Sequence, residues 1–384
     1  MHNAPVTTQD ESRDLELVPD PDEPITGTRG TATAASLNNW LAILVERKGS
    51  DLLLVPGAPV CILLDGRVKS IGTRPLTGRE IEAALVPALS SHAAQSYRET
   101  RIADFSYHTA RLGRFRINLH RQKGQAAASV RALPSIVPVL QDLGLPPAVE
   151  SLSRLSRGLV LIGGPAGGGK STTLAALINE INRKDARHIV TIEDPIEYEH
   201  KHIQSIIEQV EIGVDATDYP LALRSALRQA PDVLVIGEMR DPESMHIALA
   251  ASETGHLVFS TLHATDVVGA VSRVADSFPP ERQYTVRQEL AMALAAVLTQ
   301  FLVPSRSGGR VPVSELMMVG YGARQHIRRN ALQHLHQEIT ITRKSGSFTM
   351  EESLIALINK GHIDREDALG YAIHPEELDL LRKR

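Results

Sequence analysis

The segment Gly164–Thr172 carries the residues whose types and spacing best define a chemistry. It reads Gly-Pro-Ala-Gly-Gly-Gly-Lys-Ser-Thr and fits the spacing GxxxxGK[ST], in which glycines let backbone N–H groups turn inward around phosphate oxygens. The apolar run Leu159–Ile162 predicts a strand before it, and Thr173–Ile178 predicts a helix after it, whose N-terminus favours negative charge. We therefore expect Lys170 to reach the β- and γ-phosphates of a nucleotide and Ser171 to hold Mg²⁺. The predicted nucleotide contacts are Gly164, Pro165, Ala166, Gly167, Gly168, Gly169, Lys170, Ser171 and Thr172.

Three acidic side chains, Glu193, Asp194 and Glu197, come directly after the predicted strand His188–Ile192. Beside a triphosphate, carboxylates at a strand end can coordinate Mg²⁺ through water or orient an attacking water. We predict that Glu193 and Asp194 join Ser171 as metal ligands. The alternative is an exposed acidic turn.

A further carboxylate, Glu238, follows the apolar run Val233–Ile236. At the tip of a core strand it could position or activate water for phosphoryl transfer. His256 and His263 flank the predicted strand Leu257–Thr261 and could sense the γ-phosphate. The alternative is a pair of structural histidines bonded to the backbone; no Cys/His cluster supports a metal pair.

Composition limits the classes of protein that this chain can represent. Its 384 residues suffice for two domains, and its net charge of −4 does not demand a nucleic-acid partner. The single cysteine, Cys61, excludes a disulfide within the chain, as expected in a reducing cytoplasm. The sequence has no apolar run near the roughly 20 residues that a spanning helix needs, and its start lacks the features of a signal peptide.

The order of strand and helix patterns predicts the elements that position these residues. Strands alternate with helices from about residue 150 to 300, which is typical of a parallel sheet covered by helices on both faces. The preceding part mixes hairpins and helices, with Ser36 as the predicted N-cap of its first helix. Residues 282–302 are predicted as one helix. We expect a disordered acidic tail over 1–35, a small α+β domain over 36–133, a linker over 134–150, an α/β core over 151–304 and a helical region over 305–384.

Four segments occur in an order that resembles the type II/IV secretion ATPases, the GspE/PulE/PilT superfamily. The segments Gly164–Ser171, Thr191–Tyr198, Ile236–Asp241 and Thr254–His263 are similar to the Walker A, Asp box, Walker B and His box of this family. Their wording, TIEDPIEYEH, GEMRD and ETGHLVFSTLHATD, most resembles the PilT-like branch, which retracts type IV pili in twitching motility.

The resemblance implies a hexameric ring that hydrolyses ATP with Mg²⁺, built from a PAS-like N-terminal domain and a RecA-like domain. It implies that Glu238 and Glu197 are catalytic carboxylates and that His256 and His263 couple nucleotide state to domain motion. It also implies that arginines of the N-terminal domain reach the phosphates. The segment Gly113–Asn118 matches the family's arginine-bearing segment, and the candidates are Arg114, Arg116 and Arg131.

The resemblance further implies a cytoplasmic location at the inner face of the inner membrane. There the ring would dock on a platform protein of a pilus or secretion machine, without inserting into the membrane and without binding nucleic acid directly. A free RecA-type recombinase is disfavoured, because the motif wording is specific to secretion ATPases and the chain is not basic.

Two features divide the possible tasks. With one cysteine the chain lacks the four-cysteine zinc site usual in assembly ATPases, which favours retraction motors or compact secretion relatives. Yet in the segment 323–330 only Ala323, Ile327 and Arg329 keep the pattern of AIRNLIRE, a signature of retraction. Three interpretations remain: a retraction motor, a DotB-like secretion or conjugation ATPase of the same fold, or a PilU-like accessory subunit that docks on an active ring.

Overall fold

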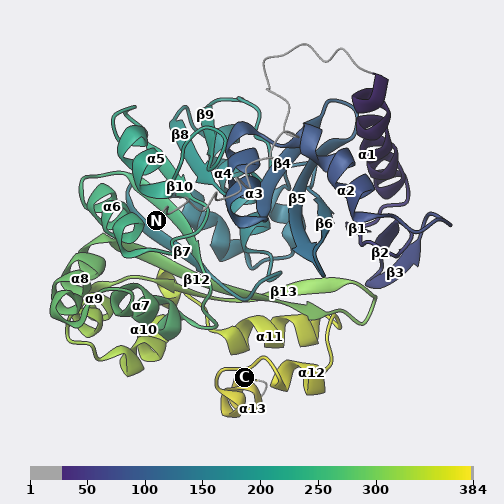
Figure 1. The fold of residues 1–384 in the computed structure, drawn as a ribbon. Coiled ribbons are helices and arrows are strands. Elements are labelled where there is room, and N and C mark those ends of the chain that lie inside the picture. Colours follow the sequence, from purple (N-terminus) through teal and green to yellow (C-terminus); the bar gives the residue numbers. More distant parts are fainter. Residues whose placement is uncertain (1–27, 382–384) are drawn as a thin grey trace, which may run out of the picture. The chain divides into compact units, whose positions relative to one another are not determined.

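Two separate sheets organise the backbone of the computed structural model, which describes residues 28–381 and the side chains of residues 36–378 (Figure 1). One sheet belongs to the unit Met1–Ser135 and the other to the unit Ile136–Arg384.

The first unit is an antiparallel sheet with a helical layer. Its strand order is β3-β2-β1-β6-β5-β4. Along β5 the side chains of Phe115, Ile117 and Leu119 are buried against the helices, whereas Arg114 and Arg116 alternate with them and share the other face. The strands are β1 (Asp51–Leu54), β2 (Cys61–Leu64), β3 (Arg67–Ser70), β4 (Ala103–Thr109), β5 (Gly113–Gln122) and β6 (Gln125–Ala132), and the helices are α1 (Thr28–Glu46), α2 (Gly78–Leu85) and α3 (Ser91–Thr100).

The start of the first helix differs from the prediction. Helix α1 begins at Thr28, so Ser36 lies inside the helix and is not its N-cap. Leu37, Leu41 and Leu44 form its buried stripe. Residues 28–35, expected in the disordered tail, are helical here, and residues 1–27 lie outside the described part of the chain.

The second unit contains a seven-stranded sheet of order β13-β12-β7-β11-β10-β8-β9. All its neighbouring strands run parallel except the pair of β12 and β13. This confirms the expected α/β class with a mostly parallel sheet. The strands are β7 (Gly158–Gly163), β8 (His188–Glu193), β9 (Ile206–Glu211), β10 (Val233–Ile236), β11 (Leu257–Leu262), β12 (Leu294–Pro304) and β13 (Arg310–Met318).

Helices cover both faces of this sheet. On one face Val160, Ile162 and Phe259 pack against the apolar side of α4 (Lys170–Lys184). On the other face Leu159 and Leu161 join a core with α5 (Tyr219–Ala226), α6 (Pro242–Glu253), α7 (Val267–Asp276), α8 (Pro280–Ala293), α9 (Tyr321–Arg328) and α10 (Leu335–Ile341). A smaller core joins the ends of β12 and β13 to α11 (Met350–Asn359), α12 (Arg365–Leu369) and α13 (Pro375–Leu381).

Two strands stand where helical structure was predicted. The predicted helix over 282–302 ends at Ala293, and Leu294–Pro304 is instead strand β12, paired with β7 and β13. Because β12 is buried on both faces, its apolar run has neither helical nor strand periodicity. The expected helical region over 305–384 also begins with a strand, β13. Its Pro312 is tolerated because β13 is an edge strand of the sheet.

Candidate nucleotide site

The predicted strand, loop and helix around Gly164–Thr172 are confirmed. Strand β7 ends at Gly163, helix α4 begins at Lys170, and the residues between them form the phosphate loop. Gly164 (φ 151°), Gly167 (φ 71°) and Gly169 (φ 87°) all have positive φ values, which other residues rarely adopt. The glycines of the motif are therefore needed for the path of the backbone.

The loop also lies against strand β12, at Gln300. A Cβ atom on Gly164 would lie 2.4 Å from the Gln300 carbonyl oxygen, and one on Gly169 would lie 2.8 Å from Gln300 Nε2. At Gly164 the clash is with backbone, so a side chain there would force the loop or β12 to move. The loop leads directly into the N-terminus of α4, where backbone N–H groups favour bound phosphate.

Lys170 lies at the centre of the loop and is 8% exposed. Its Nζ donates hydrogen bonds to the carbonyl oxygens of Gly164 and Pro165, both at 2.9 Å. Burial lowers the pKa of Lys170, and the negative charges of Glu238 and Glu197 oppose that shift. The structure thus brings two of the predicted catalytic carboxylates into electrostatic reach of the loop lysine.

The residues after Lys170 connect the loop to β8. Thr172 Oγ1 lies 3.0 Å from the hydroxyl oxygen of Tyr198, which anchors the first turn of α4 to the segment that contains Glu197. Ser171 precedes Thr172 in the same turn and is half-buried. Sequence reasoning did not single out Tyr198 as a contact, because a tyrosine next to an acidic turn has no distinctive spacing.

The two predicted acidic metal ligands have different surroundings. Glu193 Oε1 accepts hydrogen bonds from Thr191 Oγ1 (2.7 Å) and Gln209 Nε2 (3.2 Å), and burial raises the pKa of Glu193. Two protein donors therefore already hold Oε1 of this carboxyl group, and its role as a metal ligand stays a prediction. Asp194 is exposed, with Oδ2 4.0 Å from Arg240 Nη1. The structure thus leaves Asp194 more accessible to solvent than Glu193.

Glu238 forms the best-defined polar cluster of the site. Its Oε2 accepts hydrogen bonds from Arg240 Nε (2.9 Å) and lies 2.8 Å from Arg240 Nη2, and its Oε1 lies 3.2 Å from His263 Nε2. Strands β10 and β11 are parallel neighbours, so their carboxyl ends bring Glu238 and His263 together. The role of Arg240 was not foreseen, although it lies two residues after Glu238 in the GEMRD segment.

His256 is not part of this cluster. It precedes the first residue of β11, whereas His263 follows the last, so the two are about 20 Å apart along the strand. His256 Nδ1 lies 2.9 Å from the carbonyl oxygen of Ala251 and 3.3 Å from Thr254 Oγ1. The backbone-bonded alternative therefore describes its contacts within the described chain.

The three candidate arginines lie in the other unit, on one face of its sheet. Arg116 on β5 is directly opposite Arg131 on β6, and Arg114 shares that face by alternation. Arg116 Nε is 3.3 Å from Asp104 Oδ1, and Arg131 Nε is 2.9 Å from Asp51 Oδ1. The structure thus groups the arginines and gives two of them acidic partners.

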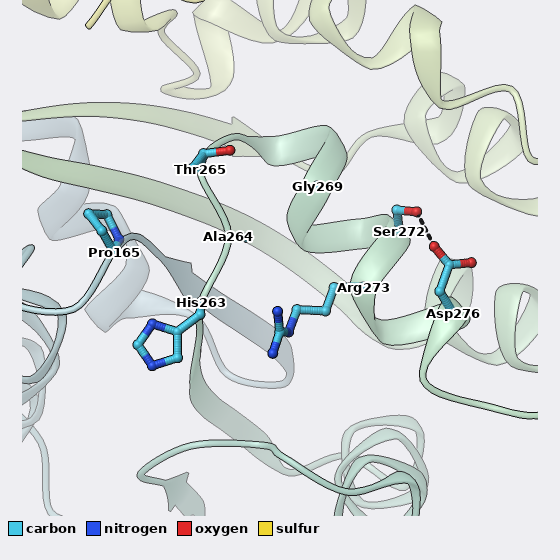
Figure 2. A pocket seen from close by; sticks show the side chains of 8 residues that line it. All are labelled: Pro165, His263, Ala264, Thr265, Gly269, Ser272, Arg273 and Asp276. Carbon is cyan, nitrogen blue, oxygen red and sulfur yellow. Dashed lines mark hydrogen bonds between the residues drawn. The ribbon is translucent and has the colours of Figure 1, made fainter.

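A hollow of about 470 Å³ opens beside the phosphate loop, next to Pro165 and His263. Figure 2 shows the guanidinium of Arg273 directed from α7 toward His263. Farther from His263, the hydroxyl of Ser272 donates a hydrogen bond to Asp276. The site is therefore open to solvent along α7, with a cation near its rim. The lining residues are Pro165, His263, Ala264, Thr265, Gly269, Ser272, Arg273 and Asp276.

The described residues contain neither a metal-binding cluster nor a helix that could span a membrane. No group of three or more His, Cys, Asp or Glu side chains is arranged to hold a metal ion within residues 36–378. None of the helices in the described part of the chain has the length and hydropathy needed to cross a membrane.

Comparisons with known proteins identify a family and several relatives. The model of the family described as type II/IV secretion system protein matches residues 33–367. The chain is 38% identical over 340 residues to the type IV pilus retractation ATPase PilT of Pseudomonas aeruginosa, covering 88% of this chain and 99% of that protein. It is 35% identical over 344 residues to the type IV pilus ATPase PilU of the same organism, covering 89% and 90%.

A solved structure is also similar. The pilus retraction motor PilT with bound ADP matches with a TM-score of 0.80 and 39% sequence identity, covering 88% of this chain and 98% of that one. The similarity extends over both units described above.

Proposed function

Because the chain belongs to the type II/IV secretion system protein family, we propose that it is an ATPase motor that drives retraction of a type IV pilus. The observation that carries this proposal is the meeting of Lys170, Glu238 and His263 at the carboxyl edge of one parallel sheet. This edge is where open α/β sheets bind their ligands.

The site residues divide the work of ATP hydrolysis. The N–H groups of the phosphate loop and Lys170 bind and orient the phosphates, and Lys170 exchanges its carbonyl partners for phosphate oxygens. Mg²⁺, when bound, supplies charge neutralisation at the phosphates, and Ser171 with Asp194 would hold it. These donors fit a hard cation, because both are oxygen ligands.

Glu238 positions the water that attacks the γ-phosphate. Arg240 and His263 hold its two carboxylate oxygens in place, and each oxygen retains a lone pair for that water. Glu197 adds a second negative charge beside Lys170 and assists in orienting the water. His263, in contact with Glu238, is placed to respond when the γ-phosphate leaves.

The larger assembly belongs to the same proposal. We assign residues 36–133 to a PAS-like domain, 134–150 to a linker, 151–304 to a RecA-like core and 305–384 to a C-terminal region that completes the sheet. Six chains would form a ring in which Arg114, Arg116 and Arg131 of one subunit approach the nucleotide of the next. That ring would act at the cytoplasmic face of the inner membrane, against a platform protein.

Two alternatives have specific support. The 35% identity to PilU favours an accessory subunit as the second candidate. A secretion or conjugation motor of the same fold remains the third, because the segment 323–330 departs from the retraction signature. Measured ATP turnover distinguishes the accessory subunit from the two motors. Restored pilus retraction in cells that lack their own motor distinguishes the retraction motor from the secretion or conjugation motor.

Steady-state ATP hydrolysis by the purified chain tests the proposal. We expect Mg²⁺-dependent turnover in a particle of about six subunits by light scattering. Lys170→Ala should lose both ATP binding and ATP turnover. Glu238→Gln should retain ATP binding, while its turnover slows by about 10² to 10⁴-fold. The control Glu253→Gln changes an exposed carboxylate outside the site and should match the parent chain. Near-normal turnover in Glu238→Gln would refute its assigned role.

A further inference from the structure

Gln300 contacts the phosphate loop from a strand that lies 130 residues away in the sequence. It is on β12, next to β7, and follows Thr299, which is in register with Gly163 at the end of β7. Only 1% of Gln300 is exposed, and its Nε2 donates a hydrogen bond of 2.7 Å to the carbonyl oxygen of Gly168. A buried side-chain amide thus holds one specific peptide group of the loop.

That hydrogen bond sets the direction of a neighbouring donor. The carbonyl of Gly168 and the N–H of Gly169 belong to one planar trans peptide, in which they point in opposite directions. When Gln300 holds the carbonyl toward β12, the Gly169 N–H points away from β12, to the side where phosphate oxygens would lie. If this peptide rotated, it would present a carbonyl oxygen to the phosphates and repel them.

The same residue also explains the glycines. Its carbonyl oxygen would lie 2.4 Å from a Cβ on Gly164 and 3.2 Å from one on Gly168, and its Nε2 would lie 2.8 Å from one on Gly169. The loop therefore lies against both the backbone and the side chain of Gln300, and this close approach leaves no room for a Cβ atom at Gly164.

The arrangement has a stability cost that packing does not explain. Gln300 Oε1 is buried and has no hydrogen-bond partner within the described residues. A methionine would fill a similar volume without burying an unsatisfied oxygen, and buried polar atoms of this kind call for a specific reason. The hydrogen bond to Gly168 supplies one.

We infer that Gln300 is a positioning residue for nucleotide binding: it fixes the Gly168–Gly169 peptide so that the loop presents its N–H group to the β-phosphate. The inference rests on the proposed function, since it assigns a phosphate to this loop. It concerns a group that ADP and ATP share, so both nucleotides depend on it equally.

Gln300→Met is the direct test, because it keeps length and burial and removes the donor. We expect dissociation constants for fluorescent ADP and ATP analogues to rise about tenfold, the effect of one lost hydrogen bond to a buried group. The KM for ATP should rise by the same factor while kcat stays within about twofold, since the lost contact acts on ground state and transition state alike. The control is Ser314→Ala, which removes a buried hydroxyl without a hydrogen-bond partner, cross-strand from Gln300, and should leave both constants unchanged.

Gln300→Glu is a second test of the hydrogen bond to Gly168, for use if the Gln300→Met variant does not fold. Its carboxyl group can donate to Gly168 only when protonated, and burial on this strand raises its pKa. We expect ADP affinity near that of the parent chain at pH 6 and at least tenfold weaker at pH 9, each relative to the parent chain at the same pH.

The outcomes are distinguishable. If the parent chain binds and hydrolyses ATP and a folded Gln300→Met binds ADP within twofold of it, the positioning role is wrong and the proposed function stands. If the parent chain binds ADP without turnover, the motor proposal fails while the binding ratios still decide the role of Gln300. A parent chain that binds no nucleotide overturns both.

Discussion

Gly164 and Gly167 belong to one loop but experience different constraints. Gly164 has a φ of 151°, and a Cβ there would meet the Gln300 carbonyl oxygen at 2.4 Å. Gly167 has a φ of 71°, and a Cβ there would meet no atom within 4 Å. The first glycine is required by space as well as conformation, and the second by conformation alone.

These constraints predict unequal effects of alanine. Gly164→Ala should weaken ADP binding by at least about 100-fold, because either the loop or β12 must move. Gly167→Ala should weaken it by only about tenfold, since a single left-handed residue costs roughly 1–2 kcal/mol. Calorimetric titration with ADP measures both, with thermal unfolding as the check on folding. Equal affinities in the two variants would contradict this assignment of roles.

The acidic residues show that neighbours in sequence can have different surroundings. Glu193 and Asp194 were predicted together as metal ligands. Glu193 accepts hydrogen bonds from Thr191 and Gln209, whereas Asp194 is exposed near Arg240. Alternation along the end of β8 separates them. A carboxylate pair in sequence is therefore not a carboxylate pair in space.

At the scale of elements, strand β13 carries a buried glutamate whose carboxyl group contacts the first residue of α7. Glu315 is 2% exposed, and its Oε2 accepts a hydrogen bond of 3.3 Å from the Val267 N–H. Burial raises the pKa of Glu315 to about 8, and the negative charges of Glu351, Asp266 and Glu377 act in the same direction. In the folded protein this carboxyl group is therefore protonated at neutral pH.

The raised pKa predicts how stability depends on pH. In the unfolded chain Glu315 ionises near 4.5, so between pH 4.5 and 8 unfolding releases a proton and stability falls as pH rises. This single group should lower the free energy of unfolding by about 2 kcal/mol between pH 5.5 and 7.0. Glu315→Gln keeps the neutral form at every pH and should remove that decline.

Urea unfolding at the two pH values measures this difference. The exposed variant Glu253→Gln serves as the control and should retain the decline of the parent chain. A Glu315→Gln protein with the same pH dependence as the parent would show that Glu315 ionises normally in the folded state.

At the scale of the whole molecule, the proposed ring makes each site the joint product of two subunits. The arginines and the phosphate loop lie in different units of the chain, Met1–Ser135 and Ile136–Arg384. If they meet only between neighbouring subunits, a chain without arginines can still supply a phosphate loop, and a chain without Lys170 can still supply arginines. Such interfaces are heterologous and close into a ring.

Mixed rings test this arrangement. The variant with Arg114→Ala, Arg116→Ala and Arg131→Ala and the variant Lys170→Ala should each be inactive alone. Co-expressed in equal amounts they should recover about a quarter of parent turnover, the fraction of interfaces with both halves intact in a random heterologous ring. Lys170→Ala with Glu238→Gln is the matched control and should recover none, because both changes lie in the same unit. Turnover retained by the arginine variant alone would exclude the arginine role.

Much of the site was predictable because it is local. The strand–loop–helix around Gly164–Thr172 follows from apolar runs, and the loop's path follows from glycine conformations, which are properties of adjacent residues. Lys170, Glu238 and Glu197 were likewise identified from their motifs, and the structure brings them into electrostatic contact. The three roles assigned to them remain proposals that the experiments above address.

The sequence by itself therefore determined the α/β class, the phosphate loop and the strands that carry the acidic and histidine residues. Only the tertiary structure decided that Leu294–Pro304 is a strand, because an apolar run buried on both faces becomes strand or helix according to the partner it packs against, here β7. That pairing brings Gln300 under the phosphate loop. The order of parallel strands likewise joined Glu238 to His263, since strand order depends on packing across the whole sheet and not on any one segment.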